Sequence, residues 1–469
     1  MAFDYDVIVI GCGTAGSRAA VTAHRQGARV LAVDGADELG GLCILRGCMP
    51  TKTLLETAHR LHDIRDAGRF GIRVGEPEVD FPAQMERMRA LVRRFQRAKV
   101  GSIEGAGYAL RRGHVRFLDA HTIEGTSGEL SGERLTAAAF VVAVGSRTRP
   151  FPAPVPEGAP VVTSDALFQL EAAPASALVV GGGAVGLEFA QWLARMGARV
   201  TLSTRSPLLH RLDLELGREL GDALGGEMET CFASRVDRVE TAGEGRARVE
   251  LTLAGGERVT REVELILNAT GRVPDLAALD LAAAGAAFDP AAVDGTFRLA
   301  PAVPHVFVAG DATGRRELLH EANLEGELAG RNAARVALGG PDAGDLARYD
   351  VGIPPVEVIF TDPPVANVGR TPQQLRADGV AFAEATKRFP QQGRGIVVGA
   401  QHGFVRIVAE PGGGRLLGCQ LIGPRADDLI HIPATLMRLG GTVRDLYGVP
   451  WYHPTLAEAF VEVCRELAG

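Results

Sequence analysis

The sequence predicts an α/β protein with two Rossmann-like dinucleotide-binding domains, followed by a C-terminal α+β domain. Three observations predict this fold. An apolar strand near the N-terminus runs into a G-x-G-x-x-G motif, the same combination recurs farther along, and strands followed by helical segments close the chain. The length of 469 residues is enough for three or so domains of roughly 150 residues each.

The first motif lies in "YDVIVIGCGTAG", where Gly11, Gly13 and Gly16 follow a buried apolar strand. Glycines at these positions let the backbone approach a pyrophosphate at the N-terminus of the next helix. A lone motif of this kind is weak evidence, because a glycine-rich turn without a ligand fits it as well.

The second motif strengthens the prediction because it repeats the first in register. "ALVVGGGAVG" places Gly181, Gly183 and Gly186 170 residues after their counterparts, and "MGARVTLST" (196–204) lies 170 residues after "QGARVLAVD" (26–34). Two strand–helix–strand units with matched spacing predict two dinucleotide sites.

The two units differ where the second strand ends. Asp34 closes that strand in the first unit, and a carboxylate there would accept hydrogen bonds from an adenosine ribose. The second unit has Thr204, Arg205 and, shortly after, Arg211, which suit a ribose 2′-phosphate. We therefore expect NADP(H) in preference to NAD(H), although arginine is common throughout this chain.

Two stretches read as domain boundaries. The Pro-rich segment "RTRPFPAPVPEGAP" (147–160) separates the two glycine motifs, and a second boundary is expected near 339–350. Beyond it, "VEVIF", "FVRIVAE" and "RLLGCQLIG" read as strands.

Composition narrows the class of protein. The net charge of −7 argues against nucleic-acid and anionic-membrane partners, and no apolar run approaches the roughly 20 residues of a membrane span. The N-terminus carries two aspartates before its apolar stretch, whereas a secretory signal begins with positive charge, so we expect a cytoplasmic protein.

Six cysteines in so long a chain do not make a structural disulfide framework, and none of their spacings is that of a zinc site, so we expect no metal. Only Cys43 and Cys48, in "GLCILRGCMPTK", are close in sequence. A regular helix would separate them too far for a disulfide, so a bridge needs an irregular helix start, which Gly47 permits. Pro50 suits a first helical turn, which would put Cys48 at a helix N-terminus that favours a thiolate. Two buried thiols are the competing interpretation.

The lysine that follows is unusual, because Lys52 is one of only three lysines among 50 basic residues. A compact ammonium group near an electron-accepting ring is a need that arginine would meet differently.

The segment "GGLCILRGCMPTK" resembles the redox-disulfide signature of the class I pyridine nucleotide–disulfide oxidoreductases, which include dihydrolipoamide dehydrogenase, glutathione reductase and mercuric reductase. The resemblance extends over essentially the whole chain. It rests further on "RGHVRF" (112–117), "ILNATGRVPD" (266–275), "VFVAGDAT" (306–313), "IPPVEVIFTDPPVANVGRT" and "HPTLAE" (453–458), although Pro364 stands where the family usually has Glu.

The resemblance implies a homodimeric FAD enzyme that passes electrons from NAD(P)H through FAD to a Cys43–Cys48 disulfide. Cys48 would face the flavin as the charge-transfer thiolate, and Cys43 would attack the substrate disulfide. His453, contributed to the other subunit's site, would be the general acid/base, a task that thiol–disulfide exchange requires.

Glu458 would orient His453, although Thr455 and Glu458 also match a helix capping box. Lys52 and Glu188 would pair beside the flavin.

The resemblance also implies the cofactor contacts and the domain limits. FAD would be held by Gly11, Gly13, Gly16, Asp34, Gly41, Lys52, Val115, Gly145, Gly310, Asp311 and Leu319. NAD(P) would be held by Gly181, Gly183, Gly186, Thr204, Arg205, Arg211 and Gly271. The domains would be FAD-binding (1–148), NAD(P)-binding (149–271), the second part of the FAD-binding domain (272–346) and dimerisation (347–469).

Within the family, His320 in "GDATGRRELLHEANLEG" resembles dihydrolipoamide dehydrogenase, whereas the Thr204–Arg205–Arg211 pattern resembles the NADPH-using reductases. Cys464 alone near the C-terminus argues against mercury reduction, while Leu45 and Arg46 depart from the family's usual Asn and Val.

The predicted substrate is a lipoyl carrier or a small disulfide or dithiol, with NADPH-dependent reduction of another small disulfide as the alternative. A flavin-centred transhydrogenase or quinone reductase and an additional scaffold role in a multienzyme complex also stay open.

Overall fold

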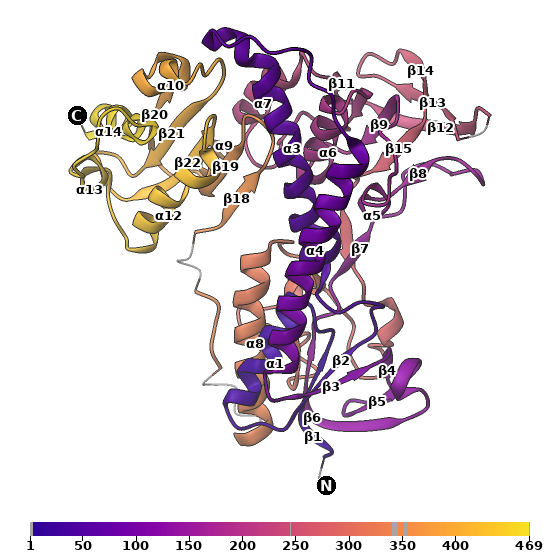
Figure 1. The fold of residues 1–469 in the computed structure, drawn as a ribbon. Helices are drawn as coiled ribbons and strands as arrows, with labels where there is room; N and C mark the ends of the chain where they lie inside the picture. The colour runs from indigo at the N-terminus through magenta and orange to yellow at the C-terminus, as the bar shows by residue number, and fades with distance from the viewer. Residues whose placement is uncertain (1–2, 244, 340–345, 351–353, 469) are drawn as a thin grey trace. The chain divides into compact units, whose positions relative to one another are not determined.

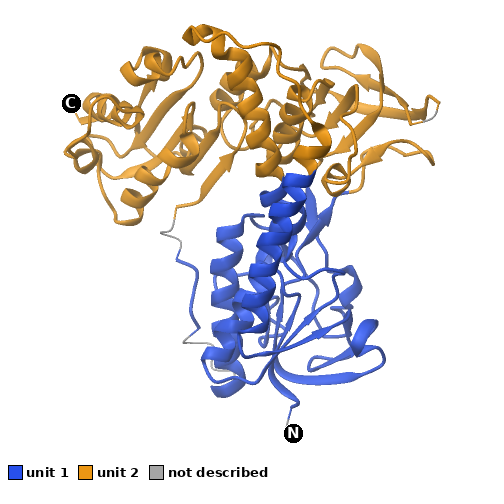
Figure 2. Ribbon diagram, in the orientation of Figure 1, with its two compact units in different colours: residues 1–50, 86–149, 271–350 blue, residues 51–85, 150–270, 351–469 orange. Residues whose placement is uncertain are grey.

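The computed structural model describes residues 3–243, 245–339, 346–350 and 354–468 (Figure 1). The chain forms two compact units, each made of several stretches of sequence (Figure 2). The first unit comprises residues 1–50, 86–149 and 271–350, and the second comprises 51–85, 150–270 and 351–469.

The first unit is built around a seven-stranded sheet in the order β3-β2-β1-β6-β5-β4, with β17 pairing to β6. Strands β1, β2, β3, β6 and β17 run parallel, and the apolar residues of β1 are shielded from water on both faces, as in parallel sheets generally. The strands are β1 (Tyr5–Ile10), β2 (Val30–Asp34), β3 (Ala109–Arg112), β4 (Val115–Phe117), β5 (Thr122–Gly125), β6 (Arg134–Val142) and β17 (Val306–Val308). A separate two-stranded ribbon pairs β7 (Ser146–Thr148) with β16 (Arg272–Pro274).

Helices α1 (Thr14–Arg25) and α8 (Leu319–Gly339) lie side by side on this unit (Figure 1). Glycine makes their close approach possible, because a Cβ atom on Gly326 or Gly330 would overlap the backbone of Ala15 or Ala19. The α8 backbone is thereby held against the first turns of α1.

Three further helices connect the early strands. They are α2 (Leu42–Arg46), α3 (Cys48–Asp66) and α4 (Phe81–Glu104). The last two cross the divisions between the compact units, at residues 50/51 and 85/86.

The second unit contains a parallel sheet in the order β11-β10-β9-β15-β8 and an antiparallel sheet β12-β13-β14. Its elements are β8 (Val161–Val162), α5 (Ser164–Leu167), β9 (Ser176–Val180), α6 (Ala184–Arg195), β10 (Arg199–Ser203), α7 (Leu214–Leu224), β11 (Glu229–Cys231), β12 (Arg235–Thr241), β13 (Ala247–Thr252), β14 (Arg258–Val263) and β15 (Leu265–Asn268). Buried residues of β9, β12, β13 and β15 share one apolar core.

The C-terminal part of the second unit is an antiparallel sheet in the order β18-β19-β22-β21-β20, with helices packed on it. Its strands are β18 (Val356–Ile359), β19 (Val365–Gly369), β20 (Ala383–Arg388), β21 (Phe404–Ala409) and β22 (Leu416–Ile422). Its helices are α9 (Pro372–Ala377), α10 (Gly393–Val397), α11 (Ala426–Leu429), α12 (His431–Arg438), α13 (Val443–Tyr447) and α14 (Ala459–Ala468).

The predicted fold class is confirmed: two α/β sheets each contain a strand, a glycine loop and a helix in succession, and an α+β region follows. The three strands predicted near the C-terminus correspond to β18, β21 and β22. Of the boundary predicted at 339–350, residues 340–345 lie outside the described residues. In the part of the chain that the structure describes, no helix is long and apolar enough to cross a membrane.

Candidate active site

The first glycine loop joins β1 to α1. Gly11 has φ +93°, and a Cβ atom there would overlap the backbone of Ala143 at the end of β6. A Cβ on Gly16 would overlap the carbonyl oxygen of Gly11, whereas one on Gly13 would come no closer than 3.7 Å to another atom, the Cα of Gly41. The loop is thus packed tightly at both ends and less tightly at Gly13, at the start of α1, where helix N-termini bind phosphate groups.

Asp34 ends β2, and only 8% of its surface is exposed. Its carboxylate accepts hydrogen bonds from the backbone N–H groups of Cys12 (2.7 Å) and Ala36 (3.0 Å). The bond from Cys12 therefore fixes the Asp34 carboxylate against the glycine loop.

A second set of polar groups surrounds Asp311, in the short 3-10 helix η5 (Gly310–Thr313) that follows β17. The hydroxyl of Ser146 donates to Asp311 Oδ2 (2.7 Å) and accepts from Arg272 Nε (2.7 Å). Arg272 also donates to the Ser146 carbonyl (2.6 Å). Sequence reasoning named Asp311 but missed Ser146 and Arg272, which the β7–β16 pairing brings together from distant segments.

The remaining residues predicted to hold FAD occupy loops and element ends. Gly41 precedes α2, and a Cβ atom there would lie 2.9 Å from the Gly13 Cα. Gly145 precedes β7, Val115 is buried at the start of β4, and Leu319 begins α8 with 44% of its surface exposed.

The second glycine loop, between β9 and α6, repeats the geometry of the first. A Cβ on Gly181 would overlap the backbone of Ala269, and one on Gly186 would overlap the carbonyl oxygen of Gly181. Around Gly183 there is no atom within 4 Å of a Cβ position, so its backbone is open. Gly271, the other glycine predicted for this site, precedes β16 with φ +109°.

The loop after β10 carries the residues predicted to select the nicotinamide. Thr204 is buried, its hydroxyl donates to the Ser206 carbonyl (2.8 Å), and it lies against Gly182. Arg205 and Arg211 are exposed, and neither forms an ion pair or hydrogen bond with another described residue. Both guanidinium groups, in the segment that follows Thr204, are therefore available to an anion.

The two cysteines of the signature stand on either side of a helix break. Cys43 is in α2, Gly47 ends that helix with φ −136° and ψ −117°, and Cys48 begins α3. A Cβ on Gly47 would lie 3.0 Å from the carbonyl oxygen of Leu42, so a larger residue would crowd the break. The irregular backbone expected between the cysteines is present, and Pro50 lies in the first turn of α3.

One turn into α3, Lys52 Nζ donates to both carboxylate oxygens of Glu188 (2.7 and 3.0 Å). Glu188 is 3% exposed and also accepts the N–H of Phe360 (3.0 Å), whose ring centroid lies 4.7 Å from Lys52 Nζ. The predicted Lys52–Glu188 pair is present, and Phe360 is the partner that sequence reasoning missed.

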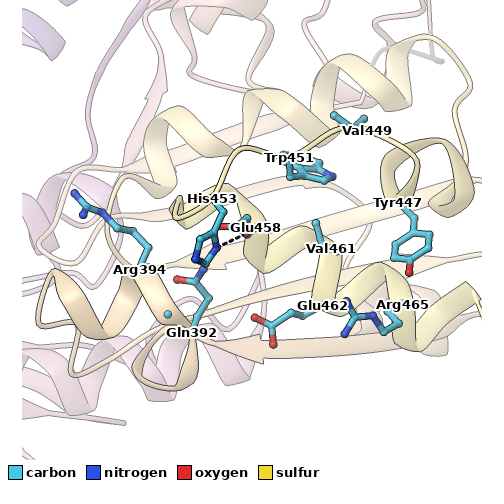
Figure 3. Close-up of a pocket in the computed structure, with 11 residues that line it drawn as sticks. Gln392, Arg394, Tyr447, Val449, Trp451, His453, Glu458, Val461, Glu462 and Arg465 are labelled. Carbon is cyan, nitrogen blue, oxygen red and sulfur yellow. Dashed lines mark hydrogen bonds and ion pairs between the residues drawn. The ribbon is translucent and has the colours of Figure 1, made fainter.

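His453 and Glu458 lie together beside α14 (Figure 3). Glu458 Oε1 is 3.0 Å from His453 Nδ1, and Glu458 Oε2 accepts the N–H of Thr455 (2.7 Å). These two contacts hold the pKa of Glu458 below its usual range. The orienting and capping roles are therefore compatible, because each uses a different oxygen of one carboxylate.

The histidine is 80% exposed on its side chain and borders a cavity of about 550 Å³. Gln392, Arg394, Trp451 and Arg465 are among the other residues that line it (Figure 3).

These features define a class of protein. A glycine loop closed by a carboxylate, as in the first unit, fits the diphosphate and ribose of FAD, and the loop with free guanidinium groups fits a nicotinamide dinucleotide. No three His, Cys, Asp or Glu side chains among the described residues gather as metal ligands. The site is that of a flavin- and nicotinamide-dependent oxidoreductase with a cysteine pair.

Comparison with known proteins gives the family. The model of the pyridine nucleotide-disulphide oxidoreductases matches residues 5–326, and that of their dimerisation domain matches residues 356–464. The chain belongs to the pyridine nucleotide-disulphide oxidoreductase family, and it is an FAD-dependent disulfide oxidoreductase that uses a pyridine nucleotide.

Its relatives include dihydrolipoyl dehydrogenases. That of Thermus scotoductus is 32% identical over 467 residues, which cover 99% of this chain and 97% of the relative. That of Bacillus subtilis is 30% identical over 478 residues, with 98% of both chains covered.

Among solved structures, the HOCl-induced flavoprotein disulfide reductase RclA from Escherichia coli has the same fold. Its Cu(II) complex superposes with a TM-score of 0.82 at 23% identity, covering 100% of both chains.

Proposed function

We propose that the chain interconverts a dithiol and a disulfide of the lipoyl type, using NAD(P)H or NAD(P)+ as the other electron carrier. The dihydrolipoyl dehydrogenase names of its relatives support this substrate class. The single observation that carries the proposal is the position of Cys43 and Cys48 on either side of the α2–α3 break. A regular helix would hold the two cysteines too far apart for a disulfide, and the break removes that constraint.

When bound, FAD supplies the chemistry that links a two-electron hydride donor to a thiol pair. Gly11, Gly13 and Gly16 would hold its diphosphate, Asp34 the adenosine ribose and Asp311 the ribityl chain. The Ser146–Arg272 contacts would keep the Asp311 carboxylate in one orientation.

The two cysteines would divide the thiol chemistry. Cys48 begins a helix, where the positive end of the helix dipole stabilises a thiolate, so it suits the flavin-facing role. Cys43 would be the thiol that exchanges with the substrate, forming a mixed disulfide that Cys48 then resolves.

His453, contributed by one subunit to the other's site, would move the proton that this exchange requires. Glu458 would hold Nδ1 and stabilise the protonated ring, since the lowered pKa keeps its carboxylate ionised. Lys52, held by Glu188, would place its ammonium group beside the flavin.

A second candidate is NADPH-dependent reduction of another small disulfide. Arg205 and Arg211 favour it, because they lie exposed in the segment after β10 without acidic partners among the described residues. In either case we propose that residues 1–148 and 272–346 bind FAD, 149–271 bind NAD(P), and 347–469 form the dimer.

The experiment that tests the proposal is steady-state turnover of lipoamide and of oxidised glutathione by wild type, Cys43→Ser and Cys231→Ser. Cys43→Ser removes the exchange thiol, so disulfide turnover should fall at least about 1,000-fold while NADPH still reduces the flavin. Cys231→Ser changes a buried cysteine outside the signature and should keep wild-type turnover. Full turnover by Cys43→Ser would contradict the assignment, and the preferred disulfide decides between the two candidates.

A further inference from the structure

Glu325 is a buried carboxyl group that the roles described above do not use. It lies in α8, only 3% of its surface is exposed, and its Oε2 accepts the backbone N–H of Gly310 at 2.7 Å. A buried acid bonded to a single backbone amide is costly to ionise, because burial removes the water that would stabilise the charge.

The carboxyl group stands where three segments of the first unit meet. A Cβ atom on Gly310 would lie 2.9 Å from the Cβ of Ala15, in the first turn of α1, and Gly326 packs on the Ala15 backbone. Glu325 therefore joins α8 to the turn that carries Asp311, beside the helix N-terminus where the first glycine loop ends.

The surroundings of Glu325 favour its neutral form. Burial is the largest cause and raises its pKa to about 8; the negative charges of Glu321 and Asp311 raise it as well. The Gly310 N–H and Arg315 act in the opposite direction. Together these groups favour the protonated carboxyl of Glu325 at neutral pH.

We propose that Glu325 is a positioning residue for FAD: its protonated carboxyl holds the Gly310–Asp311 turn against α1, and its ionisation weakens FAD binding. The proposal rests on the proposed assignment of Gly310 and Asp311 to FAD. A diphosphate at the N-terminus of α1 would repel a carboxylate in this position, so bound FAD should favour the protonated form. By linkage, the factor by which bound FAD favours protonation of Glu325 is also the factor by which ionisation of Glu325 weakens FAD binding.

The test is the dissociation constant of FAD, measured by flavin fluorescence on refolded apoprotein between pH 6 and 9.5. Wild type should bind FAD equally well up to about pH 7 and about tenfold more weakly at pH 9.5. Glu325→Gln keeps an acceptor for Gly310 without a charge, so its affinity should match wild type at pH 7 and stay level. Glu325→Ala should bind about tenfold more weakly already at pH 7, because the Gly310 amide loses its partner.

Glu321→Gln is the matched control, since Glu321 is equally buried in α8 but pairs with Arg316 and the Tyr349 hydroxyl. The FAD dissociation constant of Glu321→Gln should still rise with pH. The rise should begin at a lower pH than in wild type, because the Glu321 charge that raises the pKa of Glu325 is gone. A level wild-type profile, or an unchanged rise in Glu325→Gln, would overturn the proposal. If Glu325→Gln does not fold, FAD release from wild-type holoprotein after a jump from pH 7 to 9.5 takes its place, and an unaltered release rate overturns the proposal.

Asp311→Ala separates this proposal from the one on which it rests. Weakened FAD binding in Asp311→Ala together with a level pH profile of wild type would refute only the role of Glu325. Unchanged FAD binding in Asp311→Ala would instead refute the placement of FAD at this turn.

Discussion

The two glycine loops of this protein share one backbone design and differ in the residues that follow the second strand. In both, the first and third glycines pack against backbone atoms and the middle glycine is packed less tightly. In the first, a buried carboxylate, Asp34, closes the loop through the Cys12 amide, whereas the second has a buried Thr204 and two exposed arginines.

The two loops therefore suggest separate tasks: the glycine packing forms the backbone of a dinucleotide site, and the charge after the second strand would select the dinucleotide. Packing at the glycines is the same in both loops, so it cannot distinguish the ligands. The charge at the end of the second strand is what differs, negative in one loop and positive in the other, and a ribose hydroxyl and a ribose phosphate require these opposite charges.

Between the two loops, the largest expected effect comes from the same substitution made in each loop. In Gly16→Val and in Gly186→Val the new side chain overlaps the carbonyl oxygen of the first glycine. Gly16→Val should weaken FAD binding at least about 100-fold, whereas Gly186→Val should keep its flavin spectrum and lose a similar factor in reduction by NADPH. Gly101→Ala, which meets no atom within 4 Å, is the control. Loss of FAD in both variants would refute separate sites.

A smaller effect should follow from removing the positive charges of the second loop. Arg205→Ala combined with Arg211→Ala should lower kcat/KM for NADPH about 100-fold, because each charge-assisted hydrogen bond to a phosphate contributes about 1.5–3 kcal/mol. The value for NADH should stay within about threefold of wild type. Arg218→Ala removes another exposed arginine and should change neither value. Equal losses with the two nicotinamides would contradict the 2′-phosphate assignment.

The smallest expected effect concerns the stability of the first unit at acidic pH. The rings of His121 and His305 stack with centroids 4.1 Å apart, and His305 Nε2 contacts the Ala120 carbonyl at 2.6 Å. Burial lowers the pKa of His305 from its usual 6.5, and His121 adds to the shift, so the folded state binds this proton less readily than the unfolded chain. This contribution to stability is present above about pH 6.5 and is lost as the pH falls towards the folded-state pKa.

His305→Gln should therefore lose less stability than wild type between pH 7.5 and 5.5, by about 2 °C in the melting temperature. Flavin release, followed during heating, reports the unfolding of the first unit. Equal losses in the two proteins would show that His305 does not account for the acid sensitivity.

The comparison also explains how much of the molecule could be predicted. The sheets and loops follow from local signals, namely apolar runs and fixed glycine spacings, and both copies appear where the repeat places them. The break between Cys43 and Cys48 was predictable for the same reason, because it depends on helix geometry and one glycine.

Contacts between distant segments were harder to foresee. Ser146 and Arg272 reach Asp311 only because β7 pairs with β16, and the Phe360 amide meets Glu188 across 172 residues of sequence. Glu325 has no motif of its own that marks it as buried, since glutamate in a helix is usually exposed. The roles of His453 and Glu458 stay predictions, while their contact is established by the structure.

The central claim is that electrons from the nicotinamide reach the Cys43–Cys48 pair through the flavin. The most direct test is an anaerobic titration of the holoenzyme with NADPH and then NADH, recording the visible spectrum of wild type and Cys48→Ser. Wild type should show a long-wavelength thiolate-to-flavin absorption band after two electrons, faster with NADPH, and Cys48→Ser should show no such band. Bleaching of the wild-type flavin without that band would exclude this electron route, because the cysteines would then take no part in electron transfer.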